Sequence, residues 1–94
     1  MKTRKNTALE QRIKDLSLHD QDVIKEIYQY MQLHAEDMVH LVENMMTILQ
    51  SQDNTIKAEL YELYRRIKEK QWEDDDRAFK KNVYMIIETL AEDS

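Results

Sequence analysis

Residues 20–50 read DQDVIKEIYQYMQLHAEDMVHLVENMMTILQ, and they give the clearest indication of secondary structure in the sequence. Its apolar side chains recur at alternating spacings of three and four residues, which is the spacing of one face of an α-helix. We therefore predict one long helix over these residues, with its apolar face hidden from water in a core or a dimer interface. This predicted dimer or core face consists of Ile24, Ile27, Met31, His34, Met38, Leu41, Met45 and Ile48.

The apolar face is wider than the seam of a two-stranded coiled coil. Tyr28, Ala35, Val42 and Leu49 border it and follow one another at intervals of seven residues. A stripe of this width is typical of a helix that packs on two or more others. A chain of 94 residues buries only about 60–65% of its unfolded surface, and association is a simple way to bury more. We therefore expect a homodimer.

The lack of glycine and proline supports an all-helical fold. The 94 residues include neither. Glycine supplies the positive φ angles of tight hairpins and phosphate loops, and proline breaks helices and sets turns. A sheet-containing domain of this length would need several of each, whereas helices joined by short polar turns need none. We predict an all-α antiparallel bundle of three to four helices, with residues 1–94 as a single domain and residues 20–50 as its long central helix.

Shorter helices are predicted on both sides of the long one. Residues 1–6 are polar and are predicted to form a disordered tail. Ser17 is suited to cap the start of the long helix, and the polar residues 51–54 are suited to reverse the chain after it. Four consecutive acids at residues 73–76 repel one another within a helix but suit the start of a new one, so we expect a break there. The predicted shorter helices cover residues 7–16, 54–71 and 77–91.

The net charge of −5 is unevenly distributed along the chain. Residues 1–19 carry five basic and two acidic side chains, whereas residues 20–50 carry one basic and six acidic side chains. An acidic surface repels nucleic acid over a Debye length of about 10 Å at 0.1 M salt. No apolar run approaches the roughly 18 residues of a membrane span, and the chain has no cysteine. These features predict a cytoplasmic protein whose body does not bind nucleic acid or membranes.

No motif in the sequence specifies a reaction. The chain has no cysteine for a thiolate nucleophile or a zinc site, and no glycine for a phosphate-binding loop or a nucleophile elbow. Its many carboxylates are typical of solvated helix faces unless a pocket raises their pKa. We predict that the protein is not an enzyme and that it needs no cofactor.

Two histidines invite a more specific interpretation. Asp37 and His40 stand three residues apart, so one side of a helix would present both to a cation. A di-metal bundle needs Glu-x-x-His on two helices, however, and no histidine follows His40. We therefore assign no metal ligand and keep metal binding at this pair as a third hypothesis. His34 lies within the apolar stripe, where a polar group fixes helix register or responds to pH, or else is a boundary residue of the core.

Protein–protein contact is the function that these observations favour. We predict a small regulatory or adaptor protein that acts through helix-mediated interaction and self-association, with a protein partner of unknown identity. Trp72 is a good interface anchor beside the acidic break. The predicted partner contacts are Trp72, Asp74, Asp75 and Asp76.

The alternative prediction is a dimeric DNA-binding transcriptional regulator. It would use the basic N-terminal arm and the basic stretch at residues 65–70 to contact phosphates. Residues 16–27, LSLHDQDVIKEI, resemble the opening of the terminal helix with which many phage-type repressors dimerise, LS-x-x-D/E-x-x-x-I-K-E-I. This resemblance covers a dozen residues and implies a regulatory protein that dimerises. The DNA-binding helices of that family are not recognisable in the rest of the chain.

Overall fold

The fold is all-α, as predicted. The computed structural model describes residues 4–32, 37–70 and 77–94, with side chains from residue 9 onward. Within these ranges the chain forms five helices and no strand, so the expected bundle of three to four helices is too small by at least one. The helices are α1 (Arg4–Lys14), α2 (Leu18–Met31), α3 (Met38–Leu49), α4 (Asn54–Glu69) and α5 (Arg77–Asp93).

The prediction of one long helix over residues 20–50 is wrong. α2 ends at Met31, and the backbone leaves helical geometry at Gln32, where ψ is 133°. α3 starts anew at Met38, and the Oδ1 atom of Asp37 accepts a hydrogen bond from the His40 backbone N–H at 3.0 Å, as a helix cap does. The two helices contact each other, so much of the apolar stripe is buried within a single chain.

Short polar side chains fix where α2, α3 and α4 begin. The Oγ atom of Ser17 accepts from the Asp20 backbone N–H at 3.1 Å, which confirms the predicted cap of α2. The Oδ1 atom of Asp53 accepts from the backbone N–H groups of Thr55 and Ile56 at 2.9 and 3.3 Å. Because these contacts satisfy amides that have no partner within the helix, each start is set locally by the sequence.

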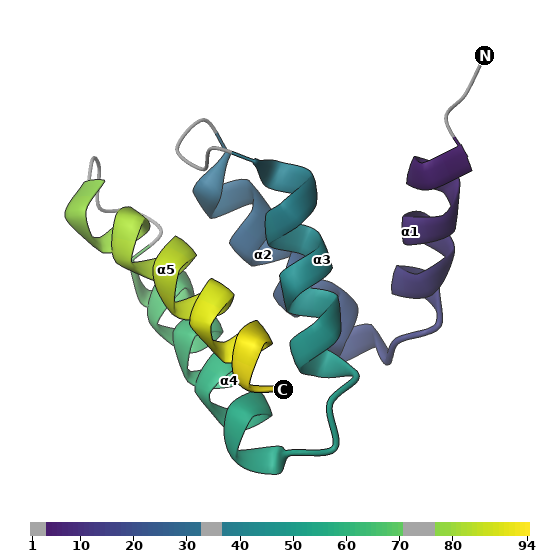
Figure 1. Ribbon diagram of the computed structural model, residues 1–94. Helices are drawn as coiled ribbons and strands as arrows, with labels where there is room; N and C mark the ends of the chain where they lie inside the picture. Colours follow the sequence, from purple (N-terminus) through teal and green to yellow (C-terminus); the bar gives the residue numbers. More distant parts are fainter. Residues whose placement is uncertain (1–3, 33–36, 71–76) are drawn as a thin grey trace.

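Helices α2 to α5 enclose the core. α5 lies along α3 and also contacts α4, while α2 packs on both α3 and α4 (Figure 1). All the buried residues with described side chains are apolar. α4 and α5 are separate helices, as the expected break implied, although residues 71–76 themselves lie outside the described chain. The fully buried side chains are Val23, Ile27, Met31, Leu41, Met45, Met46, Ile48, Leu60, Ile67, Val83 and Ile87.

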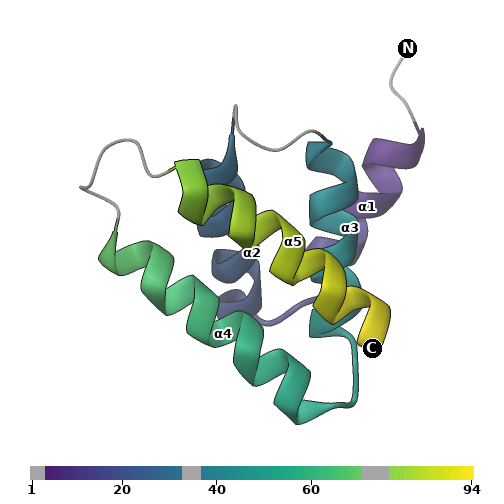
Figure 2. The same cartoon turned by 60° about the vertical axis from the view of Figure 1, so that its left-hand side comes forward.

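Helix α1 stands at the edge of this bundle. It begins at Arg4, three residues before the predicted start, and packs against α3 on the side away from α4 and α5 (Figures 1 and 2). Leu9, Ile13 and Leu16 are only partly buried where they meet the core. None of the described helices combines the length and the apolar character that a membrane span requires.

Candidate functional site

The predicted apolar face of residues 20–50 is mainly the core of one chain. Six of its eight residues are buried among α2 to α5, Met38 is half-buried at the edge of a groove, and His34 lies outside the described residues. The predicted partner contacts Trp72, Asp74, Asp75 and Asp76 also lie outside them. The six buried residues are Ile24, Ile27, Met31, Leu41, Met45 and Ile48.

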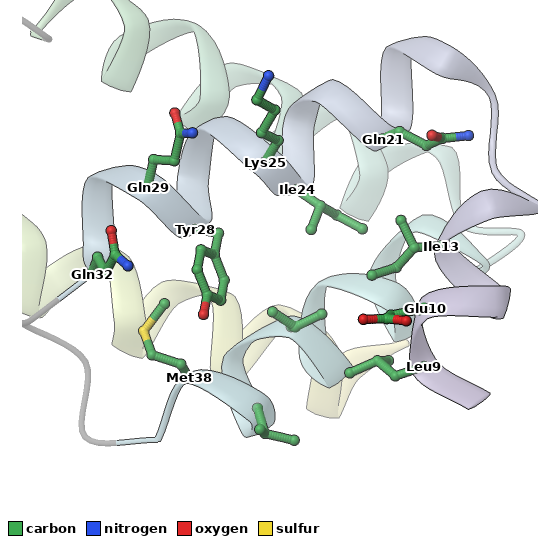
Figure 3. Close-up of a pocket in the computed structure, with 12 residues that line it drawn as sticks. Leu9, Glu10, Ile13, Gln21, Ile24, Lys25, Tyr28, Gln29, Gln32 and Met38 are labelled. Carbon is green, nitrogen blue, oxygen red and sulfur yellow. The ribbon is translucent and has the colours of Figure 1, made fainter. Parts of the chain in front are cut away.

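An open groove lies between α1, α2 and α3. Its volume is about 600 Å³, which falls within the usual range of about 300–1,000 Å³ for binding pockets in proteins. α2 and α3 form its two sides, and α1 closes one end (Figure 3). The apolar residues that line this groove are Leu9, Ile13, Ile24, Tyr28, Met38, Val39 and Val42.

The lining of the groove is apolar on the inside and polar at the rim. Tyr28 projects from α2 between the two sides, and it and Val39 are 37% and 41% exposed. Lys25 and Gln29 point away from the groove, whereas the carboxylate of Glu10 points from α1 into it (Figure 3). The charged group that faces an occupant of the groove is therefore an acid.

The position of α1 creates the groove, and a few polar contacts hold it. The Arg12 guanidinium donates to the Oε1 atom of Gln50 at 3.0 Å, across to the end of α3. The Gln21 side-chain amide donates to the carbonyl oxygens of Leu16 and Lys14 at 2.9 and 3.3 Å, which fixes the turn between α1 and α2. These contacts keep α1 at the end of the α2–α3 surface instead of over it.

The sequence held a partial signal for this site. Tyr28 and Val42 are apolar residues that border the predicted apolar face of residues 20–50, and both line the groove. Leu9 and Glu10 were not singled out as site residues, because a short amphipathic helix gives no indication of the angle at which it packs. The sequence also held no indication of Val39, because this residue falls outside the apolar pattern with spacings of three and four residues.

A cluster of polar side chains joins α2 to α4. The phenol of Tyr61 donates to the Oδ1 atom of Asp20 at 2.7 Å, and the phenol of Tyr64 donates to the Oδ2 atom of Asp22. Burial, followed by the hydrogen bond to Asp20, raises the pKa of Tyr61 to about 12. The His19 ring meets both tyrosine rings edge-on, with centroids 5.3 and 5.7 Å away. These contacts join two helices, and none of the five residues lines the groove.

Most basic side chains of the stretch at residues 65–70 contact other groups of the protein. The Arg65 guanidinium pairs with the carboxylates of Glu62 and Glu69 on the same helix. The Nζ atoms of Lys68 and Lys70 lie 5.3 and 5.0 Å from the ring centroids of Tyr64 and Phe79. Three of the four cationic side chains of this stretch, Arg65, Lys68 and Lys70, thus contact groups of the protein itself, and these three give the predicted DNA-binding alternative no support.

The pair Asp37 and His40 has a structural role. Asp37 caps α3 through the backbone of His40, and the His40 Nε2 atom lies 3.7 Å from the Oε2 atom of Glu88 on α5. No group of three or more metal-ligating side chains occurs among the described residues. The third hypothesis, a metal held by Asp37 and His40, thus finds no ligand set in that part of the chain.

Comparison with known proteins adds no relative to this picture. No family model, curated protein or solved structure matches the chain. The stretch that resembles a repressor helix, residues 16–27, forms the last residues before α2 and its first turns, with Ser17 as the cap. The groove and its chemistry are therefore the basis for a function.

Proposed function

We propose that this protein is a small interaction module that binds a helix of a partner protein in the groove between α1, α2 and α3. The observation that carries the proposal is an open apolar groove beside a complete core. Most of the apolar lining belongs to the core or packs against it, but Tyr28 and Val39 are exposed in the groove and lie outside the buried core. Apolar grooves between helices are a recurrent way of receiving an amphipathic helix.

The shape and lining of the groove support a helix as occupant. Along α2 it extends from Gln21 to Gln32, which corresponds to about 17 Å at 1.5 Å per residue and matches three turns of a helix. Apolar side chains of a bound helix would displace water from this groove, whose volume is about 600 Å³. The release of such water from an apolar surface is the main driving force for association.

A homodimer stays a prediction. Its original argument was the apolar face of residues 20–50, and most of that face is buried within one chain. Among the described residues, the exposed apolar surface left for self-association lies at the groove, at Leu18 and at the pair Met85 and Ile86 on α5.

A selection of helix-forming peptides tests the proposed function. Peptides enriched on the wild-type protein from a displayed random library are measured against Val39→Asp, which places a carboxylate in the groove. Met85→Asp is the matched control, because Met85 is 54% exposed on α5 and does not line the groove. We expect Val39→Asp to lose the enriched peptides and Met85→Asp to keep them. Equal binding by both variants would refute the groove as the binding site.

A further inference from the structure

We propose that the helix received by the groove is cationic, with aliphatic side chains at helical spacing on the groove floor and a lysine or arginine that faces Glu10. This inference rests on the proposed function and names the chemical class of the partner. Its grounds are the direction in which the Glu10 carboxylate points and the surfaces that the chain itself offers.

Glu10 is the reason for a cationic partner. Its carboxylate points into the groove from the end wall formed by α1 (Figure 3). No ion pair joins it to another residue in the described part of the chain. A partner that covers the groove would remove water from this carboxylate, and desolvation of an unpaired charge is costly. A cation on the partner offsets this cost, whereas an aliphatic or acidic residue there does not.

No exposed surface among the described residues has the pattern that a second copy of the chain would need in order to fill the groove. α1 is basic and amphipathic, but its residues Leu9 and Ile13, and Leu16 just after it, already pack against the core of the same chain. The exposed pair Met85 and Ile86 on α5 is adjacent in sequence and does not form the i, i+3, i+4, i+7 series of an inserted helix. A separate partner therefore fits the groove better than a second protomer does.

Two defined peptides test the inference on the full-length protein. One is a fluorescently labelled 14-residue helix of leucine and lysine, with leucines at i, i+3, i+4 and i+7, and the other has glutamate in place of every lysine. Binding is followed by fluorescence anisotropy. We expect the leucine–lysine peptide to bind at least about tenfold more tightly than the leucine–glutamate peptide, with a difference that shrinks as salt is added.

Variants assign this preference to the groove. Glu10→Lys should weaken binding of the leucine–lysine peptide about fivefold or more. Glu59→Lys is the matched control, since it makes the same charge change on an exposed residue of α4 that does not line the groove. If Glu59→Lys weakens binding as much as Glu10→Lys does, the attraction is general and the inference is overturned. Circular dichroism melting establishes that each variant is folded.

The remaining outcomes separate this inference from the proposed function. Equal binding of both peptides, lost in Val39→Asp, would overturn the cationic partner and leave the groove as a helix site. Binding that neither Val39→Asp nor Tyr28→Ala reduces would overturn both. Light scattering of the protein alone adds one more outcome, because a dimer that Val39→Asp dissociates would make a second copy the occupant. Tyr28→Ala keeps the test valid if Val39→Asp lowers the melting temperature.

Discussion

The phenol of Tyr61 donates a hydrogen bond of 2.7 Å to the carboxylate of Asp20, and this contact ties the middle of α4 to the first turn of α2. Tyr64, one turn further along α4, makes the same kind of contact with Asp22. α2 also contributes Ile24 and Tyr28 to the lining of the groove. The two contacts with α4 fix the helix that forms one side of the groove.

Alkaline pH should weaken the fold through Tyr61. Its pKa is raised from 10.0 to about 12, mainly by burial and then by the hydrogen bond to Asp20, so the folded state holds the phenol proton more tightly than the unfolded state. The resulting stabilisation is complete below about pH 10 and is lost as the pH rises to about 12. Urea unfolding between pH 8 and 12 should show this decline. It should be shallower in Tyr61→Phe and unchanged in the exposed control Tyr28→Phe.

Replacement of Asp37 by alanine distinguishes two helices from one. In the structure Asp37 caps α3, so Asp37→Ala should lower the free energy of unfolding by about 1 kcal/mol. In a continuous helix over residues 20–50 the same change would raise stability, because alanine is the better residue in a helix interior. Urea denaturation gives the sign, with Glu59→Ala on α4 as the control. A stabilised Asp37→Ala would contradict the break between α2 and α3.

The sequence predicts which side chains are buried better than it predicts how the helices connect. Met31 and Met38 are seven residues apart, which is close to two helical turns, so the apolar pattern keeps its phase across the place where the chain leaves the helix. Periodicity alone therefore cannot separate one long helix from two shorter ones. Asp37 carried the missing information, but its spacing from His40 also fits a pair of metal ligands, and only the backbone geometry identifies it as a cap.

The groove depends on tertiary geometry that periodicity does not encode. Leu9 and Ile13 are predictable as the apolar side of a helix, and the structure places both on α1. The angle of that helix depends on contacts between residues far apart in sequence, such as Arg12 with Gln50. The end wall of the groove, and the direction in which Glu10 points, follow from this angle and could not be derived from the pattern of residues.

Loss of the contact between Arg12 and Gln50 should loosen α1 alone. The hydrogen bond is exposed, so Gln50→Ala should cost less than about 1 kcal/mol of global stability. Because α1 is only partly buried against the core, its local opening should become easier. Hydrogen exchange followed by mass spectrometry should show faster exchange over residues 4–14 and unchanged exchange in α3 and α4. Gln29→Ala, a change at an exposed glutamine of α2, is the control. Uniformly faster exchange would mean that α1 is part of the cooperative core.

The role of the 20–50 stripe can be settled by two methionines that differ in burial. Met45 is fully buried among the helices of one chain, whereas Met38 is half-buried at the groove. Met45→Ala should lower the free energy of unfolding by about 2–5 kcal/mol, and Met38→Ala by clearly less, because less of its side chain leaves an apolar environment. If the stripe is the core of one chain, this loss does not depend on protein concentration. A melting temperature that rises with concentration in the wild type, and no longer does so in Met45→Ala, would instead place Met45 in a dimer interface, since association stabilises the folded state by mass action.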